Sequence, residues 1–234
     1  MTMLESAGHA MPDDLLSVRN LTRRFGSQAI IENLSFSIPK GNRVTLFAPS
    51  GAGKTTLINI LTRLDRNYEG DWSLAAENSA TIFQEPRLFP YMTIQENIFL
   101  PARIRGTPIT EGLMEKYGRW LEVCDLSAYT RHYPYQLSGG MKQKVALIRG
   151  FLTEPDLVMM DEPFTSIDFQ SKRAIIRHIL DTYPQITVLF VTHTVDEIPL
   201  LTQSLLLFKA NRLAEFATYD ASHLSVNIME AIYG

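Results

Sequence analysis

Residues 47–56 read F-A-P-S-G-A-G-K-T-T and lie between two stretches with opposite patterns. Residues 43–47 are β-branched and apolar enough for a buried strand, whereas leucine and isoleucine recur over residues 57–64 at the spacing of one helical face. Small residues between a strand and a helix let the backbone curl so that successive N–H groups point inward. Together with the N-terminus of the helix, such a curl suits a polyphosphate, so we expect a phosphate-binding loop here.

The polar residues of this loop have separate expected tasks. Lys54 would reach the β- and γ-phosphates, and the Thr55 hydroxyl would hold Mg²⁺. We expect the other loop contacts from Ser50, Gly51, Ala52, Gly53 and Thr56. Ala48 stands where the pattern G-x-x-x-x-G-K-[ST] begins with glycine, so its backbone angles are an open question. The alternative is a glycine-rich turn with a solvated lysine, because short motifs recur by accident.

Composition narrows the class of protein. The chain has 234 residues, of which 45% are hydrophobic and 20% charged, as in an ordinary globular protein. A net charge of −3 without a long basic run argues against nucleic-acid binding. The single cysteine, Cys124, excludes an internal disulfide framework and lies on an apolar helical stripe, where we expect it to be buried. No apolar run approaches the ~20 residues of a membrane span, and residues 1–12 indicate a tail rather than a signal peptide.

The rest of the chain alternates strand and helix signals. Strands are predicted at residues 15–21, 30–38, 81–84, 157–160, 187–192 and 204–208. Helices are predicted from a capping box at Thr93, and over residues 113–124, 138–152 and 176–183. Residues 67–78 are expected to be irregular. The sequence therefore predicts an α/β fold with a mostly parallel central sheet, an N-terminal antiparallel β part, and about fifty mainly helical residues inserted after Gln84.

Four polar positions come directly after predicted strands. They are Gln84, the adjacent Asp161 and Glu162, and His193. Because ligands bind at the carboxyl ends of parallel strands, we expect these side chains on the same rim as the phosphate loop. Asp161 would bind Mg²⁺, and Glu162 would act as a general base for an attacking water. Gln84 would contact the metal or that water, and His193 the γ-phosphate. The plainer alternatives are a solvated acidic pair and a strand-end histidine.

The chain resembles the ATP-hydrolysing subunits of ABC transporters over residues 15–210, because its motifs follow one another in the order that is characteristic of that family. The discriminating segment is L-S-G-G at residues 137–140, which other P-loop enzymes lack. The resemblance implies that Phe25 stacks on the nucleotide base and that Asp168, in S-I-D at 166–168, lies in the nucleotide site. It also implies a head-to-tail homodimer with two ATP molecules between the subunits. Each ATP would touch the phosphate loop of one subunit and Ser138, Gly139 and Gly140 of the other.

The resemblance further implies one ABC ATPase domain over residues 13–234, with a helical subdomain over about 86–150 that carries the L-S-G-G segment. The residues after Gln84 would contact a transmembrane permease, at the cytoplasmic face of the cell membrane. Segments such as D-E-P-F at 161–164 are similar to importers of nitrate, sulfonate, taurine, bicarbonate or thiamine precursors, which work with an extracytoplasmic solute-binding protein. The sequence departs from the family at Ala48, at Met141 (usually Gln), at Phe25 (more often Tyr) and in the short stretch 68–78.

Two other functions compete with an importer ATPase. A soluble ABC ATPase acting on nucleic acid or ribosomes would favour tandem nucleotide domains, a basic surface or zinc-binding cysteines. This chain has one such domain, a net negative charge and one cysteine, so no nucleic-acid partner is expected. A regulatory module without turnover is disfavoured by Glu162 and His193, which supply the catalytic groups.

Overall fold

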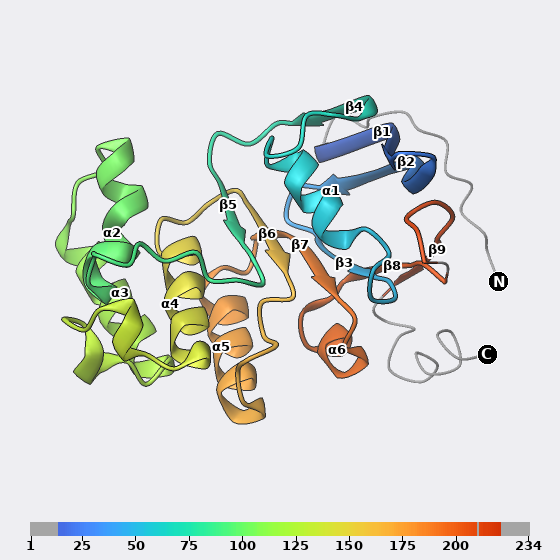
Figure 1. Cartoon of the computed structure of the whole chain (residues 1–234). Coiled ribbons are helices and arrows are strands. Elements are labelled where there is room, and N and C mark those ends of the chain that lie inside the picture. The colour runs from blue at the N-terminus through green and yellow to red at the C-terminus, as the bar shows by residue number, and fades with distance from the viewer. Residues whose placement is uncertain (1–13, 210, 221–234) are drawn as a thin grey trace.

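A computed structural model describes residues 14–209 and 211–220 and shows two sheets with helices packed around them (Figure 1). The larger sheet has the order β5-β6-β7-β3-β8-β9, and the smaller has the order β2-β1-β4. Helix α1 lies between the two sheets, whereas α2, α3 and α4 gather at the opposite end of the molecule (Figure 1). The predicted α/β fold with an antiparallel N-terminal part is confirmed. The predicted N-terminal tail lies outside the described residues.

The larger sheet is parallel except at one edge. Its strands are β3 (Arg43–Phe47), β5 (Ser79–Ile82), β6 (Leu157–Asp161), β7 (Thr187–Thr192), β8 (Ser204–Leu207) and β9 (Ala217–Asp220). Strands β6 and β7 are buried at every residue, as expected when both faces of a parallel sheet are covered. Strand β9 pairs antiparallel with β8 and was missed from the sequence, because its A-T-Y-D stretch is short and mostly exposed.

The smaller sheet corrects one prediction. It consists of β1 (Asp14–Phe25), β2 (Gln28–Pro39) and β4 (Glu69–Leu74), and β4 lies within the stretch that was expected to be irregular. Strand β4 is an edge strand with no buried residue, so it lacks the apolar alternation of a half-buried strand. Gly70 in β4 has φ 90°, and a Cβ there would lie 2.4 Å from the Asn20 carbonyl of β1. Only glycine allows β4 to approach β1 this closely.

The helices agree with the predicted periodicities. They are α1 (Lys54–Leu61), α2 (Ile94–Arg105), α3 (Glu111–Val123), α4 (Gly139–Phe151), α5 (Phe169–Thr182) and the short α6 (Ile198–Leu201). The capping box at Thr93 is present, with Glu96 bonded back to it. One detail of the prediction was wrong: α1 ends at Leu61, so Leu64 lies beyond the helix and is 60% exposed. No described helix is long and apolar enough to cross a membrane.

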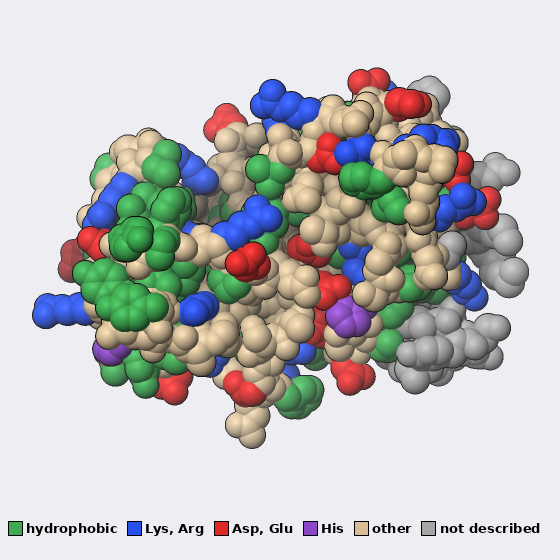
Figure 2. All heavy atoms as spheres, viewed as in Figure 1, with side chains coloured by type: hydrophobic (Ala, Val, Ile, Leu, Met, Phe, Trp, Pro, Cys, Tyr) green, Lys and Arg blue, Asp and Glu red, His purple; other side chains and the backbone are tan. Residues whose placement is uncertain are grey.

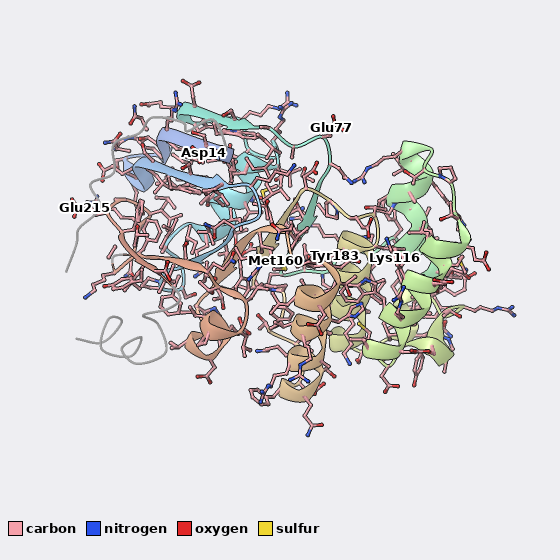
Figure 3. All side chains as sticks on the ribbon, turned by 180° about the vertical axis from the view of Figure 1, so that it is seen from behind. Asp14, Glu77, Lys116, Met160, Tyr183 and Glu215 are labelled. Carbon is pink, nitrogen blue, oxygen red and sulfur yellow. The ribbon has the colours of Figure 1, made fainter. Side chains whose placement is uncertain are left out.

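One of the buried clusters joins the helices after β5 to the larger sheet. Phe99, Trp120 and Phe151 from three helices belong to the same buried cluster as Met160 of β6 and Phe190 of β7. Seen from behind, Met160 lies where the sheet meets the helices, and Tyr183 lies toward them (Figure 3). Cys124 is fully buried in this cluster, as predicted, and burial raises the pKa of its thiol to about 12. The division of the chain at about 86–150 stays a prediction.

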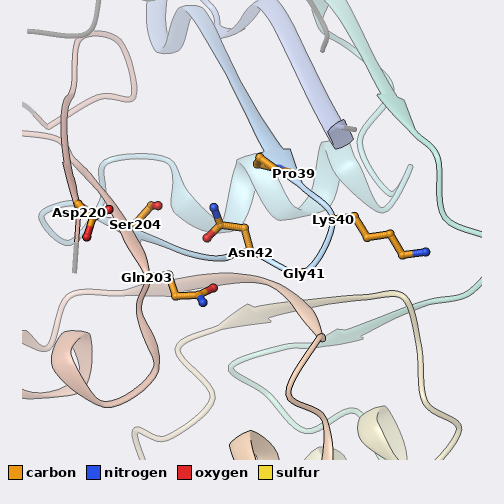
Figure 4. A pocket seen from close by; sticks show the side chains of 7 residues that line it. All are labelled: Pro39, Lys40, Gly41, Asn42, Gln203, Ser204 and Asp220. Carbon is orange, nitrogen blue, oxygen red and sulfur yellow. The ribbon is translucent and has the colours of Figure 1, made fainter. Parts of the chain in front are cut away.

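A polar hollow of about 450 Å³ lies at the amino ends of β3 and β8 (Figure 4). Pro39, Lys40, Gly41, Asn42, Gln203, Ser204 and Asp220 line it. The phosphate loop leaves the carboxyl end of β3, so the hollow is at the other end of these strands. It is therefore separate from the phosphate loop and from the polar residues at the carboxyl ends of the strands.

Candidate nucleotide site

The loop after β3 has the tight backbone that its small residues predict. Gly51 and Gly53 both have positive φ, 79° and 100°, and Gly53 is the N-cap of α1. A Cβ on Gly53 would lie 2.5 Å from Cγ2 of Ile30 on β2, so no larger residue fits without moving that strand. Ala48 is fully buried and is not among the residues with positive φ. The first position of the loop thus does not need glycine in this chain.

Lys54 begins α1 and folds back over the loop. Its Nζ donates hydrogen bonds of 2.9 Å to the carbonyl oxygens of Ala48 and Pro49, and lies 3.6 Å from Oε1 of Glu162. The side chain is only 5% exposed. A lysine held in this way is not the solvated residue of the alternative interpretation. Its charge therefore lies against the backbone of the loop and beside the Glu162 carboxylate.

Thr55 and Asp161 form the second part of the site. The Thr55 hydroxyl donates to Oδ2 of Asp161 at 2.7 Å, and Asp161 is 1% exposed at the end of β6. Burial raises the pKa of the Asp161 carboxyl, because the charged form loses its hydration. The described residues contain no group of three or more His, Cys, Asp or Glu side chains suited to a metal. One hydroxyl and one carboxylate fit Mg²⁺ all the same, since it usually takes its other ligands from water and substrate phosphates.

Glu162 is held on two sides. His193 Nδ1 lies 2.8 Å from its Oε1, and Gln84 Nε2 donates to its Oε2 at 3.3 Å. An ionised carboxylate only accepts hydrogen bonds, so His193 carries its proton on Nδ1 in this arrangement. Glu162 has φ 47°, an uncommon value for a residue other than glycine, and its N–H donates to the Val191 carbonyl of β7. This turn aims the carboxylate back toward Lys54.

The structure therefore brings six predicted residues together at the carboxyl ends of four adjoining strands. They are Lys54, Thr55, Gln84, Asp161, Glu162 and His193. Two of them have partners that the sequence did not suggest, because Gln84 and His193 both bond Glu162 here. Their expected contacts with a metal, a water or a γ-phosphate stay predictions.

The remaining predicted residues make other contacts. Phe25 is 53% exposed at the end of β1, with the Arg23 guanidinium 4.1 Å from its ring centre. Ser138 caps α4 by accepting from Met141 N, and Asp168 caps α5 by accepting from Ser171 N. A Cβ on Gly140 would lie 2.6 Å from the Ser166 carbonyl, so the L-S-G-G segment packs tightly against the S-I-D segment. Among the contacts of the described residues, none links Phe25, Ser138 or Asp168 to the six residues at the carboxyl ends of the strands.

Two polar residues of α4, the buried Gln143 and the partly buried Arg149, were not predicted from the sequence. Gln143 donates to the Phe83 carbonyl at 3.1 Å, and Arg149 donates to the carbonyls of Pro86 and Arg87. They hold the backbone on both sides of Gln84. The available signal was a polar side chain next to the apolar stripe of a predicted helix, which alone does not distinguish a buried group from a solvated one.

Loop, helix and strand-end carboxylates define a nucleotide-binding protein of the P-loop class. Residues 31–165, more than half of the chain, match the family described as ABC transporter. The chain belongs to the ABC transporter family.

Individual relatives agree with this assignment. The chain is 32% identical over 208 residues to the aliphatic sulfonates import ATP-binding protein SsuB of Bacillus cereus, covering 83% of this chain and 81% of the relative. It is 34% identical over 219 residues to the spermidine/putrescine import ATP-binding protein PotA of Nitrosomonas eutropha, covering 88% of this chain and 60% of that longer protein. It is 32% identical over 217 residues to the Fe(3+) ions import ATP-binding protein FbpC of Photorhabdus laumondii, covering 88% of this chain and 62% of that protein.

Solved structures share the fold. An ATP-binding subunit of an ABC transporter superposes with a TM-score of 0.79 at 24% identity, covering 94% of this chain and 95% of the other. The dimeric structure of MJ0796, a bacterial ABC transporter cassette, gives a TM-score of 0.75 at 23% identity, covering 88% and 98%.

Proposed function

We propose that this chain is the ATP-hydrolysing subunit of an ABC importer, which drives uptake of a small solute through a separate membrane permease. The observation that carries the hydrolytic part is the carboxylate of Glu162. It lies between Gln84 and His193, and 3.6 Å from Lys54. A structural acidic pair at a strand end would have no reason to gather these three partners.

The geometry supports hydrolysis of the γ-phosphate. Water attacks the γ-phosphorus, Glu162 accepts a proton from that water, and the bond to the β–γ bridging oxygen breaks to release ADP and phosphate. Lys54 binds the β- and γ-phosphates, and the hydrogen bonds from Gln84 and His193 orient the Glu162 carboxylate. Mg²⁺, held by Thr55 and Asp161, would neutralise charge on the phosphates.

The direction of transport is inferred from the relatives. Those at 32–34% identity carry names that describe import of sulfonates, polyamines or Fe³⁺. Because the names cover unlike solutes, they support an importer without specifying its cargo. A soluble ABC ATPase acting on nucleic acid has no observation of its own in its favour, as the chain is acidic overall. We place the subunit at the cytoplasmic face of the membrane, with a solute-binding protein on the other side.

The test of hydrolysis is Glu162→Gln. The purified wild-type protein is expected to hydrolyse ATP only with Mg²⁺. The variant keeps the shape and a hydrogen-bond acceptor but loses the base, so it is expected to bind ATP and to lose kcat by about 10²–10⁴-fold. Glu85→Gln is the matched control, since Glu85 is an exposed neighbour of Gln84. A near-wild-type kcat for Glu162→Gln would rule out the assignment of the base.

A further inference from the structure

A second carboxylate, Glu197, is buried beside the site but takes no part in the hydrolytic steps. It lies in a short 3₁₀ turn, Val195–Glu197, directly after the His193 turn, and is 3% exposed. Its Oε2 accepts a 2.7 Å hydrogen bond from the Thr192 hydroxyl, and its Oε1 pairs with Nζ of Lys172 on α5. Burying a carboxylate is costly unless it is paired and hydrogen-bonded, and here both conditions are met.

Thr192 joins this carboxylate to the backbone on both sides of His193. It is the last residue of β7 and is 1% exposed. Its hydroxyl donates to Glu197 and accepts a 3.0 Å hydrogen bond from the backbone N–H of Thr194. The residues before and after His193 are therefore fixed by one hydroxyl.

The His193 ring itself has little else to fix it. Its side chain is 46% exposed, and its described polar contact is the 2.8 Å bond to Glu162. The direction of the ring thus depends on the backbone turn beneath it. A displacement of about 1 Å at a reacting centre can cost on the order of 10²-fold in rate.

We propose that Glu197 is a positioning residue for His193: it acts through the Thr192 hydroxyl, and its ion pair with Lys172 holds it in place from α5. This inference rests on the proposed function only where it uses turnover as a readout. It assigns a task to a buried ion pair that the hydrolytic steps leave unexplained.

The first experiment compares two buried threonines. Thr192→Val keeps the shape of the side chain but removes the hydroxyl that links Glu197 to Thr194. Thr45→Val is the matched control, because Thr45 is also fully buried, in the adjoining strand β3, and its hydroxyl pairs with Thr202 instead. Hydrogen exchange of the Thr194 amide, measured without nucleotide, is expected to speed up in Thr192→Val and not in Thr45→Val. Unchanged exchange in Thr192→Val would overturn the proposal.

The second experiment asks whether the effect passes through His193. Thr192→Val is expected to lower kcat by on the order of 10²-fold, with an unchanged Kd for ATP measured without Mg²⁺. In a His193→Ala background the same substitution is expected to lower kcat no further. Additive losses would mean a general structural role and would sink the proposal. An inactive wild-type protein would instead count against the proposed function, and the exchange measurement would still decide the positioning.

A second variant covers the case in which Thr192→Val does not fold. Lys172→Met combined with Glu197→Leu removes both charges and leaves neither unpaired, so folding is expected to survive. It leaves the Thr192 hydroxyl without its acceptor. The expected result is the same faster Thr194 exchange and lower kcat, again without an additional loss in the His193→Ala background. Wild-type exchange and kcat in this double variant would contradict the role of Glu197.

Discussion

At the scale of single residues, two glycines of the phosphate loop are required for different physical reasons. Gly51 and Gly53 share a positive φ, but a Cβ on Gly51 would meet nothing within 4 Å, whereas one on Gly53 would collide with Ile30. At position 51 only the backbone conformation requires glycine. At position 53 the backbone conformation and the close packing of β2 both require it. Sequence patterns record both positions identically.

This difference predicts unequal costs of two matched substitutions. Gly51→Ala is expected to lower the free energy of unfolding by about 1–2 kcal/mol, the usual cost of a left-handed conformation. Gly53→Ala is expected to cost more, because β2 must also move away from the loop. Urea denaturation of the two variants measures the difference. Equal losses would show that the contact with Ile30 relaxes freely.

Residue-level prediction from the sequence succeeded where chain geometry determines position. The carboxyl ends of parallel strands meet on one rim of the sheet, so Gln84, Asp161, Glu162 and His193 could be expected together. Prediction failed where a partner is set by packing. Nothing local in the sequence indicates that Gln143 bonds the Phe83 carbonyl, or that Thr192 and Lys172 share the carboxylate of Glu197.

At the scale of elements, α5 carries a histidine that packs against α3. The ring of His178 stands edge-on to Trp120, with 4.5 Å between ring centres, and its Nε2 is buried without a hydrogen-bond partner. Burial, and to a smaller extent the charge of Arg119, lowers the pKa of His178. The folded protein therefore binds this proton less readily than the unfolded chain does.

The lowered pKa of His178 gives the pH dependence of stability a definite sign. Above the ordinary histidine pKa of about 6.5 both states are neutral at His178, and the folded state keeps its full stability. As pH falls through that value the unfolded chain takes up the proton first, so the free energy of unfolding decreases. Thermal denaturation at pH 7.5 and 5.5 is expected to show a smaller fall in Tm for His178→Gln than for wild type. Equal falls would show that His178 does not contribute.

Strands at the edges of the two sheets were the part of the fold that hydrophobic patterns did not predict. The buried strands β6 and β7 were predicted from continuous apolar runs, because a strand that is covered on both faces carries apolar side chains on both. Strands β4 and β9 are exposed at sheet edges, and their pairing comes from backbone hydrogen bonds that leave no apolar alternation in the sequence. Such strands become recognisable only when the neighbouring strand is known.

The loop after Gln84 is an element with a rigid base and an exposed tip. Asn97 of α2 is fully buried, accepts from Phe89 N and donates to the carbonyls of Phe89, Met92 and Thr93. Tyr91 between them is 93% exposed. Hydrophobic side chains also gather at the helical end of the molecule (Figure 2). A preformed loop that presents an aromatic residue suits docking of a permease helix.

A single-cysteine experiment tests this docking. The native Cys124 is buried, so a cysteine at position 91 would be the accessible thiol of the described residues. Tyr91→Cys carrying a photo-crosslinker is expected to link to integral membrane proteins in solubilised membranes. Thr218→Cys, on the exposed edge strand β9, is the control and is expected not to do so. Links from Tyr91→Cys to soluble proteins alone would count against an importer.

At the scale of the whole molecule, two helix N-termini are predicted to bind the same nucleotide. The phosphate loop precedes α1, and the L-S-G-G segment opens α4 with Ser138 as its cap. Each N-terminus offers free N–H groups and the positive end of a helix dipole. A head-to-tail pair of subunits, as the sequence predicts, would let one ATP use both with rigid parts, and two-fold symmetry would then make two equal sites.

Mixed dimers test whether the L-S-G-G segment acts on the partner. A Lys54→Ala subunit is paired with a Ser138→Arg subunit. If the segment acts across the interface, both lesions fall on one composite site and the other stays intact. Nucleotide occupancy, measured without turnover, is expected to show one well-formed site per dimer. Two equally damaged sites would mean that each subunit uses its own segment. If Ser138 is only a helix cap worth about 1 kcal/mol, a dimer of two Ser138→Arg subunits would keep two well-formed sites, whereas an acting segment predicts that both are damaged.

The position of β3 in the sheet has a consequence for synthesis on the ribosome. In the described residues β3 pairs with β7 and β8 alone, and these begin at Thr187 and Ser204. The strand that carries the phosphate loop is therefore made early but has no neighbour until about 140 residues later. At 5–20 residues per second this wait lasts roughly 7–30 s, during which β3 has neither of its neighbouring strands. A polypeptide released before Thr187 would leave β3 unpaired, so an incomplete subunit is expected to be recognised by proteases rather than to occupy a transporter without working.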